Sequence, residues 1–392
     1  MTTTSFDSDR ARTIEASGRS VPFQLAQPRN AAFWVLTLGL AAGAWVTTQI
    51  YLRELAAYWV ALSTGLAGSA LYAALWLAIL LRCNKFVQLP RRLLAMVTVW
   101  SGLVSTMAMA APANDALSSL YAKAFGQAWV AEWSSAWAAP FTEEISKATA
   151  VVLALGLAPH LVRSARDGLM TGAFAGLGFQ FAENVLYAFQ AAHHDFGTNQ
   201  LLYSVSTLTT RAASGLLASS HVVFSALFCA GLLWLLGRPD KEHRLHGATL
   251  MASAIALHFL FNGAEPIAHL AGLPAEALRF AFVSPVLYML LWWALRLSEP
   301  EHRVWTRAVL TPEVARGVLT DAEATAASGG WRHRRAYLRT RPRGPARKQG
   351  KRVLASTLDL VRELTRSAGS DTEEVRLVRV RTELLRRRAG AG

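Results

Sequence analysis

The stretch PFTEEISKATAVVLALGLAP (residues 140–159) poses the central problem of this sequence, because it puts charged side chains into an apolar segment. Glu143, Glu144 and Lys147 stand at its head, and the residues that follow have the composition of a membrane helix. An ionisable side chain in hydrocarbon costs about 2.5 kcal/mol or more, and such residues are usually functional. Two adjacent acids and a base therefore indicate a polar site inside a membrane.

The composition of the whole chain supports a membrane location. Of its 392 residues, 53% are hydrophobic and only 17% are charged, whereas soluble domains carry about 25% charged residues. A helix needs about 20 apolar residues to cross roughly 30 Å of hydrocarbon. We expect about eight such helices and therefore an all-α polytopic membrane protein. The predicted spans are residues 31–52, 57–81, 93–111, 136–161, 168–192, 207–236, 248–263 and 280–295.

The lysines and arginines of the short loops predict the orientation of the chain, because cytoplasmic loops carry an excess of them. They gather in the first 30 residues and in the loops after the second, fourth and sixth spans, and they are few in the other loops. This alternation predicts a multi-pass protein of the cell membrane with both termini in the cytoplasm. We therefore expect a cytoplasmic N-terminal arm (1–30), a transmembrane domain (31–296) and a basic cytoplasmic tail (297–392).

The tail has a charge pattern of its own. It contains 21 of the 40 Lys and Arg residues and 11 acids. Residues 331–352 include ten basic residues and no acid, with Pro and Gly between them, which predicts disorder. Residues 354–366 and 373–388 have the pattern of short amphipathic helices. We expect a mostly disordered or short-helical tail that is attracted to anionic lipids, and no nucleic-acid partner, because no nucleic-acid-binding signature is present.

Ionisable and amide side chains also interrupt three later spans. Each lies within otherwise apolar sequence, where lipid disfavours it. Some are spaced four residues apart and therefore project from one helix face, as Glu143 and Lys147 do. The residues are Glu183, with Phe179 four residues before it, and Asn184 in span 168–192; Arg211 and His221 in span 207–236; and His258, with Asn262 four residues after it, in span 248–263.

The predicted topology puts five of these side chains at a similar depth. Counted from the outer end of each span at 1.5 Å per residue, they lie roughly 8 to 14 Å below the outer face, with the histidine of span 207–236 slightly deeper. One pocket could therefore hold all of them. The five residues are Glu143, Glu144, Glu183, His221 and His258.

Each residue alone has a simpler structural explanation. An intramembrane histidine or asparagine, such as Asn184, often forms a hydrogen bond between helices. Glu143 and Lys147 could form a buried pair that only neutralises itself. Three carboxylates and two histidines on four helices at one depth nevertheless favour a common site.

Carboxylate and imidazole groups together suit hydrolysis. They activate a water for attack on a carbonyl, either directly as a general base or through a bound metal. Glutamate and histidine are ordinary zinc ligands, although the chain has no HExxH motif. Lys147 could keep one neighbouring glutamate ionised, and Asn262 could donate a hydrogen bond to a developing oxyanion. The candidate metal ligands are Glu144, Glu183, His221 and His258.

Four motifs, in this order, resemble those of the PrsW family of intramembrane proteases, which is related to the CAAX prenyl endopeptidases and the bacteriocin-processing group. EEISK (143–147) resembles the family's EExxK motif, and FQFAE (179–183) resembles its FxxxE motif. The segment around His221 resembles its third polar helix. HFLFN (258–262) resembles the last motif, although Asn262 stands where an HxxxD form has aspartate. The resemblance covers about residues 30–296.

The resemblance implies a peptidase that cleaves a membrane-anchored protein within or beside the membrane, such as the anti-sigma factor cleaved by the family's founding member. It implies water activation by Glu143 and Glu144, a site completed by Glu183 and His221, and oxyanion stabilisation by His258 with Asn262. The chemistry would be either that of a zinc metalloprotease or that of a glutamic protease.

Two functions from other classes also fit the sequence. A proton- or ion-coupled transporter would use the same carboxylates and histidines as a relay. Transporters often have internal symmetry, and no internal repeat stands out in this chain. A non-catalytic membrane scaffold would use the polar residues for helix packing alone.

Overall fold

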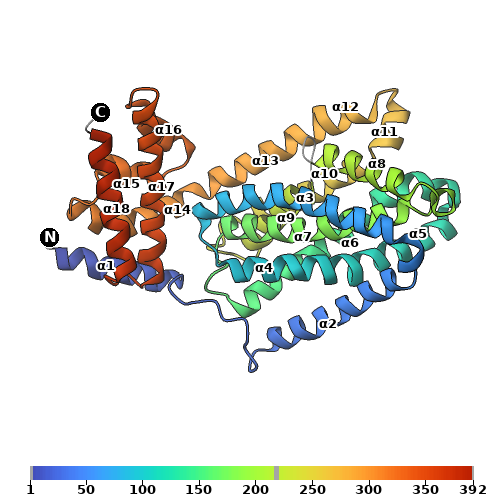
Figure 1. Ribbon diagram of the computed structural model, residues 1–392, viewed down its shortest axis with the longest axis horizontal. Coiled ribbons are helices and arrows are strands. Elements are labelled where there is room, and N and C mark those ends of the chain that lie inside the picture. The colour runs from blue at the N-terminus through green and yellow to red at the C-terminus, as the bar shows by residue number, and fades with distance from the viewer. Residues whose placement is uncertain (1–2, 216–219, 391–392) are drawn as a thin grey trace. The chain divides into compact units, whose positions relative to one another are not determined.

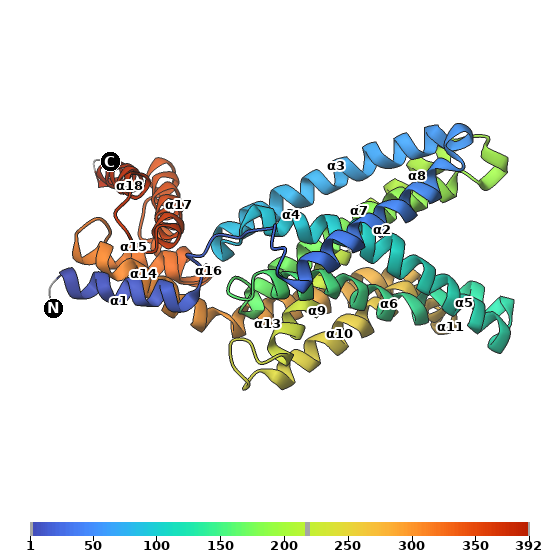
Figure 2. The same ribbon diagram turned by 90° about the horizontal axis from the view of Figure 1, so that it is seen from below.

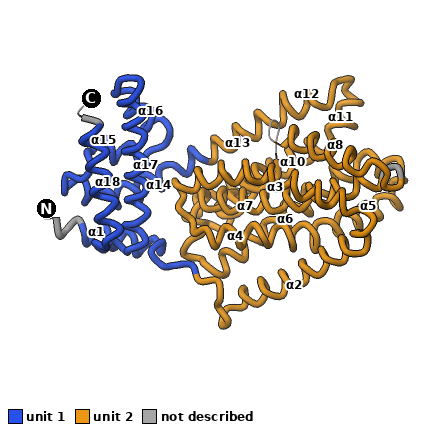
Figure 3. The backbone as a smooth tube through the Cα atoms, viewed as in Figure 1, with its two compact units in different colours: residues 1–23, 295–392 blue, residues 24–294 orange. Residues whose placement is uncertain are grey.

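The computed structural model describes residues 3–215 and 220–390, and within these ranges the protein is helical and has no strand. The chain forms two compact units (Figure 3). Unit 1 combines residues 1–23 with residues 295–392, and unit 2 comprises residues 24–294. Both ends of the chain therefore belong to the same unit.

Unit 2 contains the long apolar helices (Figure 1). Helix α4 continues without a break through the π-helical segment η1 into α5. The elements of unit 2 are α2 (Ala31–Leu52), α3 (Leu55–Val87), α4 (Arg91–Trp100), η1 (Ser101–Ala110), α5 (Ala111–Phe125), α6 (Gln127–Leu157), α7 (Ala165–Ala191), η2 (His194–Gly197), α8 (Gln200–Ala213), α9 (His221–Leu235), α10 (Arg244–Asn262), α11 (Ala264–Ala271), α12 (Ala275–Ala277), η4 (Leu278–Val283) and α13 (Ser284–Leu297).

Five helical segments within the described residues are long and apolar enough to cross a membrane, which supports a multi-pass membrane protein. The predicted number of eight spans is not confirmed. Helices α6 and α7 have the length to span, but they carry the ionisable residues, and α9 has only 15 residues. The five segments are Ala31–Leu52, Leu55–Val87, Arg91–Phe125, Arg244–Asn262 and Ala275–Leu297.

The predicted span 207–236 is wrong as a single helix. Helix α8 ends at Ala213 and α9 begins at His221, and residues 216–219 between them lie outside the described part of the chain. Ser220 has extended backbone angles (φ −135°, ψ 160°) and occupies the N-cap position of α9. Serine and glycine, which flank this break at Ser214, Gly215 and Ser220, are poor helix formers. His221 is consequently the first residue of a helix.

Helix α7 lies in the middle of unit 2, where α3 and α9 pack against it (Figures 1 and 2). Glycines on α7 allow a very close approach to α9. A Cβ atom at Gly172 would lie 2.2 Å from the carbonyl oxygen of Ser225, and one at Gly176 would lie 2.2 Å from that of His221. This contact sets the first turn of α9 directly against α7.

Unit 1 is a helical unit with its own apolar core, so the prediction of a mostly disordered tail is not confirmed. Residues 331–352, expected to be disordered, form α16 and the start of α17. Within residues 331–352, Tyr337 is buried in the core of the unit although the charge pattern predicted disorder. The predicted amphipathic helices 354–366 and 373–388 lie within α17 and α18, and Leu354, Val361 and Leu364 of α17 are buried in the core. The helices are α1 (Thr3–Ser17), α14 (Glu299–Ala315), α15 (Asp321–Ser328), α16 (Trp331–Arg339), α17 (Pro345–Arg366) and α18 (Glu373–Gly390).

A buried glutamate joins three helices of unit 1. The carboxylate of Glu313, on α14, accepts hydrogen bonds from Arg10 of α1 at 2.7 Å and from Arg316 at 2.9 Å. Arg379 of α18 donates two more, at 2.7 and 2.8 Å. Because Glu313 is fully buried, this network holds the first helix of the chain to helices near its end.

Candidate active site

Ionisable side chains from four helices meet inside unit 2. Helix α6 supplies three of them from just over one turn, and α7, α9 and α10 supply one each. All are buried except His221, whose side chain is 12% exposed. The structure thus brings together the five residues predicted to share one pocket, Glu143, Glu144, Glu183, His221 and His258, and places Lys147 among them.

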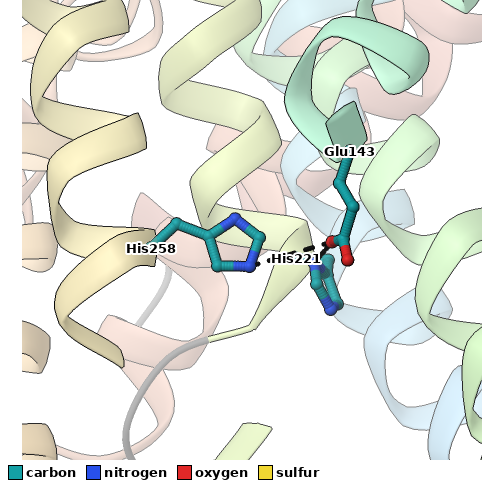
Figure 4. A group of neighbouring side chains, drawn as sticks. All are labelled: Glu143, His221 and His258. Carbon is teal, nitrogen blue, oxygen red and sulfur yellow. Dashed lines mark ion pairs between the residues drawn. The ribbon is translucent and has the colours of Figure 1, made fainter. Parts of the chain in front are cut away.

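Glu143, His221 and His258 form a compact group within this cluster (Figure 4). Glu143 Oε2 lies 3.5 Å from His221 Nδ1 and 3.8 Å from His258 Nε2. One donor atom from each residue lies within 4.8 Å of the other two. The ring of Phe224 stacks on His258 at 4.7 Å, with 11° between the planes, which fixes the orientation of that imidazole.

The donor atoms of this group suit a metal ion. Two histidines and a glutamate are a known ligand set of catalytic zinc, and bonds of about 2.1 Å in a tetrahedral site place ligand atoms about 3.4 Å apart. The two separations from Glu143 are close to that value. Of the predicted metal ligands, His221 and His258 belong to this group, and its carboxylate is that of Glu143.

The other predicted ligands, Glu144 and Glu183, lie behind the two histidines. Glu144 Oε1 is 3.2 Å from His258 Nδ1, and Glu183 Oε2 is 2.9 Å from His221 Nε2. Each imidazole therefore has one nitrogen near the carboxylate of Glu143 and the other near a second carboxylate, that of Glu183 for His221 and that of Glu144 for His258. Histidines that bind metals usually have this arrangement, because the outer carboxylate orients the ring and raises its basicity.

Lys147 is the cation at the centre of the cluster. Its Nζ donates to Glu144 Oε1 at 2.7 Å, lies 3.5 Å from Glu143 Oε2, and is 2.9 Å from His221 Nδ1. An ammonium group only donates, so His221 Nδ1 accepts and the ring proton is assigned to Nε2, which donates to Glu183. The Phe179 ring lies 4.3 Å from Nζ and covers the charge.

Three polar residues of the site were not among the predicted site residues. Arg211 of α8 forms an ion pair with Glu183 and also donates to Asn184 Oδ1 at 2.7 Å. Gln180 donates to the same oxygen at 2.9 Å, so the predicted residue Asn184 links α7 to α8. Ser225 donates to Glu144 Oε2 at 3.0 Å. An arginine within an apolar segment, and a serine four residues after His221, were the signals available in the sequence.

Asn262 has a partner outside the cluster. Its Nδ2 donates to the carbonyl oxygen of Ser135 on α6 at 3.2 Å, and the residue is partly exposed. This bond links the end of α10 to α6. A contact of Asn262 with an oxyanion stays a prediction.

The charges of the cluster are not balanced. Three carboxylates face two basic side chains, Lys147 and Arg211, when both imidazoles are neutral. Glu143 is the least compensated, because its nearest cation is closer to Glu144. A buried charge without a partner is costly. The site therefore favours one additional positive charge, such as a metal ion or a proton, next to Glu143.

The model of the PrsW family intramembrane metalloproteases matches residues 89–295, which is more than half of the chain. The chain belongs to this family. The predicted family membership is thereby confirmed, and this PrsW-family protein is a peptidase of a family described as metalloproteases. The matched region contains every residue of the cluster. Searches of curated proteins and of solved structures found no match.

Proposed function

We propose that this PrsW-family protein hydrolyses a peptide bond in a membrane-anchored protein, and that Glu143, His221 and His258 are the centre of its active site. The observation that carries the proposal is the convergence of these three side chains, of which only His221 is partly exposed, with a carboxylate behind each histidine. Anti-sigma factors are the substrate class that the family resemblance suggests.

In this proposal Glu143, His221 and His258 hold a zinc ion, which when bound would polarise a water and the scissile carbonyl. Glu144 and Glu183 orient the two imidazoles from behind. Lys147 offsets the charge of Glu144, and it must release His221 Nδ1 before that nitrogen can bind a metal. Burial of the cluster excludes bulk water, which strengthens the electrostatic interactions within it.

A glutamate-only mechanism would give Glu143 a different task. As the least compensated carboxylate, it would accept a proton from the attacking water, with the neighbouring histidines holding the proton in turn. Glu143 is therefore the first residue to substitute under either chemistry, and exhaustive chelation separates the two. Cleavage that survives chelation would exclude the metal.

The experiment uses cells that co-express the protease with single-span anti-sigma factors carrying an N-terminal tag. We expect cleavage with the parent protein and loss of cleavage with Glu143→Gln and with His258→Ala, at equal amounts of protein in the membrane. The matched control is His193→Ala, which removes a histidine that pairs with Glu54 outside the cluster. Equal cleavage by the parent and both site variants would reject the assignment.

We also infer that both termini, and unit 1 with them, lie in the cytoplasm of a cell whose plasma membrane holds unit 2. The Lys and Arg bias of the short loops supports this orientation. A reporter fused to the C-terminus that is active only in the cytoplasm should be active, and a reporter active only outside should not. The opposite result would reverse the topology.

A further inference from the structure

Helix α18 of unit 1 has two apolar faces, although only one of them packs against the rest of the unit. The first face packs into the core of the unit, with Val375 fully buried and Val378 against the core. The second face consists of Leu377, Val380 and Leu384, which are 62%, 55% and 51% exposed. Spacings of three and four residues align these side chains in one stripe along the helix. We call these three residues the α18 stripe.

Arginines line both margins of the α18 stripe. At 100° per residue, Arg376 and Arg387 lie on one side of it, and Arg381 and Arg388 lie on the other. All four are exposed, and the nearest acids to Arg376 and Arg381 are 3.8 and 3.6 Å away. The acids on the helix do not cancel this charge, because two of them are in the first turn and the third, Glu383, is partly buried.

An apolar stripe between two basic margins is typical of a helix that lies in the interface of an anionic bilayer. Its apolar side chains enter the acyl boundary while the arginines contact the headgroups. Such a helix needs both the apolar side chains and the flanking charges, and α18 has both on its exposed side.

The chain connects unit 1 to the bilayer at two places. Candidate span Ala275–Leu297 runs up to the start of α14, which begins at Glu299. At the other connection, candidate span Ala31–Leu52 begins a few residues after Phe23, where the first segment of unit 1 ends. Such tethering replaces a bimolecular encounter with the membrane by an intramolecular one.

We propose that the α18 stripe, with its four marginal arginines, docks on the anionic lipid surface of the membrane that the protein spans. This gives the general attraction of the tail to anionic lipids a specific contact surface. It does not depend on the proteolytic activity of unit 2. A second copy of the chain fits the stripe less well, because two such faces would bring the arginines of both copies together.

The negative charge of the membrane surface determines how strongly each arginine favours the docked state of α18. One arginine near an anionic surface changes the ratio of docked to free helix about fivefold. The contribution is screened by salt, because the Debye length falls from about 10 Å at 0.1 M to about 3 Å at 1 M. Docking should therefore depend on lipid charge, on salt and on the number of marginal arginines.

The test uses the full-length protein in nanodiscs, with a polarity-sensitive fluorophore on a single exposed cysteine. Cys83→Ser removes the exposed native thiol, and Cys229 is buried. The probe is attached at Leu377→Cys on the stripe or, as a matched control, at Ala322→Cys on α15, which is exposed and off the stripe. The discs contain phosphatidylcholine alone or phosphatidylcholine mixed with phosphatidylglycerol.

We expect a blue shift of the emission at position 377 only in discs that contain phosphatidylglycerol, and no shift at position 322. High salt should reverse the shift, and Arg387→Gln with Arg388→Gln should lower the docked-to-free ratio roughly 25-fold. Equal emission at position 377 in both kinds of disc would overturn the proposal. So would a shift that persists in detergent without phospholipid, because the stripe would then be covered by protein.

Discussion

Glu183→Gln tests whether the carboxylates behind the two histidines prepare them to bind a metal. Glu183 Oε2 lies 2.9 Å from His221 Nε2, and loss of such an outer carboxylate costs about 10- to 100-fold in metal affinity. Glutamine keeps the size and an acceptor oxygen but loses the charge, so the ring stays oriented while its basicity falls and Arg211 loses its ion pair. We therefore expect the lower end of the range, about tenfold or about 1.4 kcal/mol.

The assay is a titration of metal-free protein in detergent with Zn²⁺, in competition with a chromophoric chelator. The matched control is Glu54→Gln, which removes the carboxylate that pairs with His193 at 2.7 Å outside the cluster. Its zinc affinity should equal that of the parent. The reasoning is refuted if Glu183→Gln binds zinc as tightly as the parent while His258→Ala does not bind it, or if both glutamine variants weaken binding equally.

Two further predictions concern the packing around the site and the stability of unit 1. Gly176→Ala should lower zinc affinity and proteolysis together, because its Cβ atom would lie 2.2 Å from the carbonyl oxygen of His221. The control Gly65→Ala, whose Cβ atom would have its nearest neighbour at 3.2 Å, should have a small effect. Unchanged zinc binding in Gly176→Ala would contradict this packing. Glu313→Gln should destabilise unit 1 by about 3–5 kcal/mol, because it leaves Arg10 and Arg379 without their buried partner. Hydrogen exchange of α14 and α18 measures this loss, and Asp321→Asn, at an exposed ion pair, should leave it unchanged.

Much of the site could be predicted from the sequence, because lipid makes every buried charge conspicuous. Glu143, Lys147, Glu183 and the two histidines stood out as ionisable residues in apolar segments, and the structure brings them together. Their division of roles could not be predicted. Adjacent residues on a helix point about 100° apart, and a depth estimate does not tell which acid faces the histidines.

The fold was predicted less completely, for two physical reasons. Hydropathy does not reveal a break in the middle of an apolar stretch, so the interruption before His221 was missed. The many arginines of residues 331–352, with Pro and Gly between them, indicated disorder, but Tyr337 of this segment is buried in the core of unit 1 and Leu338 packs against it. Where charge and periodicity disagree, periodicity describes the folded helix better.

X-ray absorption at the zinc edge of the purified protein tests the central claim most directly, because it detects the ligands and does not depend on a substrate. The account predicts bound zinc with nitrogen and oxygen neighbours at about 2.0–2.1 Å and the outer-shell scattering of two imidazoles. His258→Ala should remove one imidazole, and His193→Ala should remove none. Zinc absent after loading of the parent protein, or two imidazoles still bound in His258→Ala, would contradict the assignment of Glu143, His221 and His258 as a metal site.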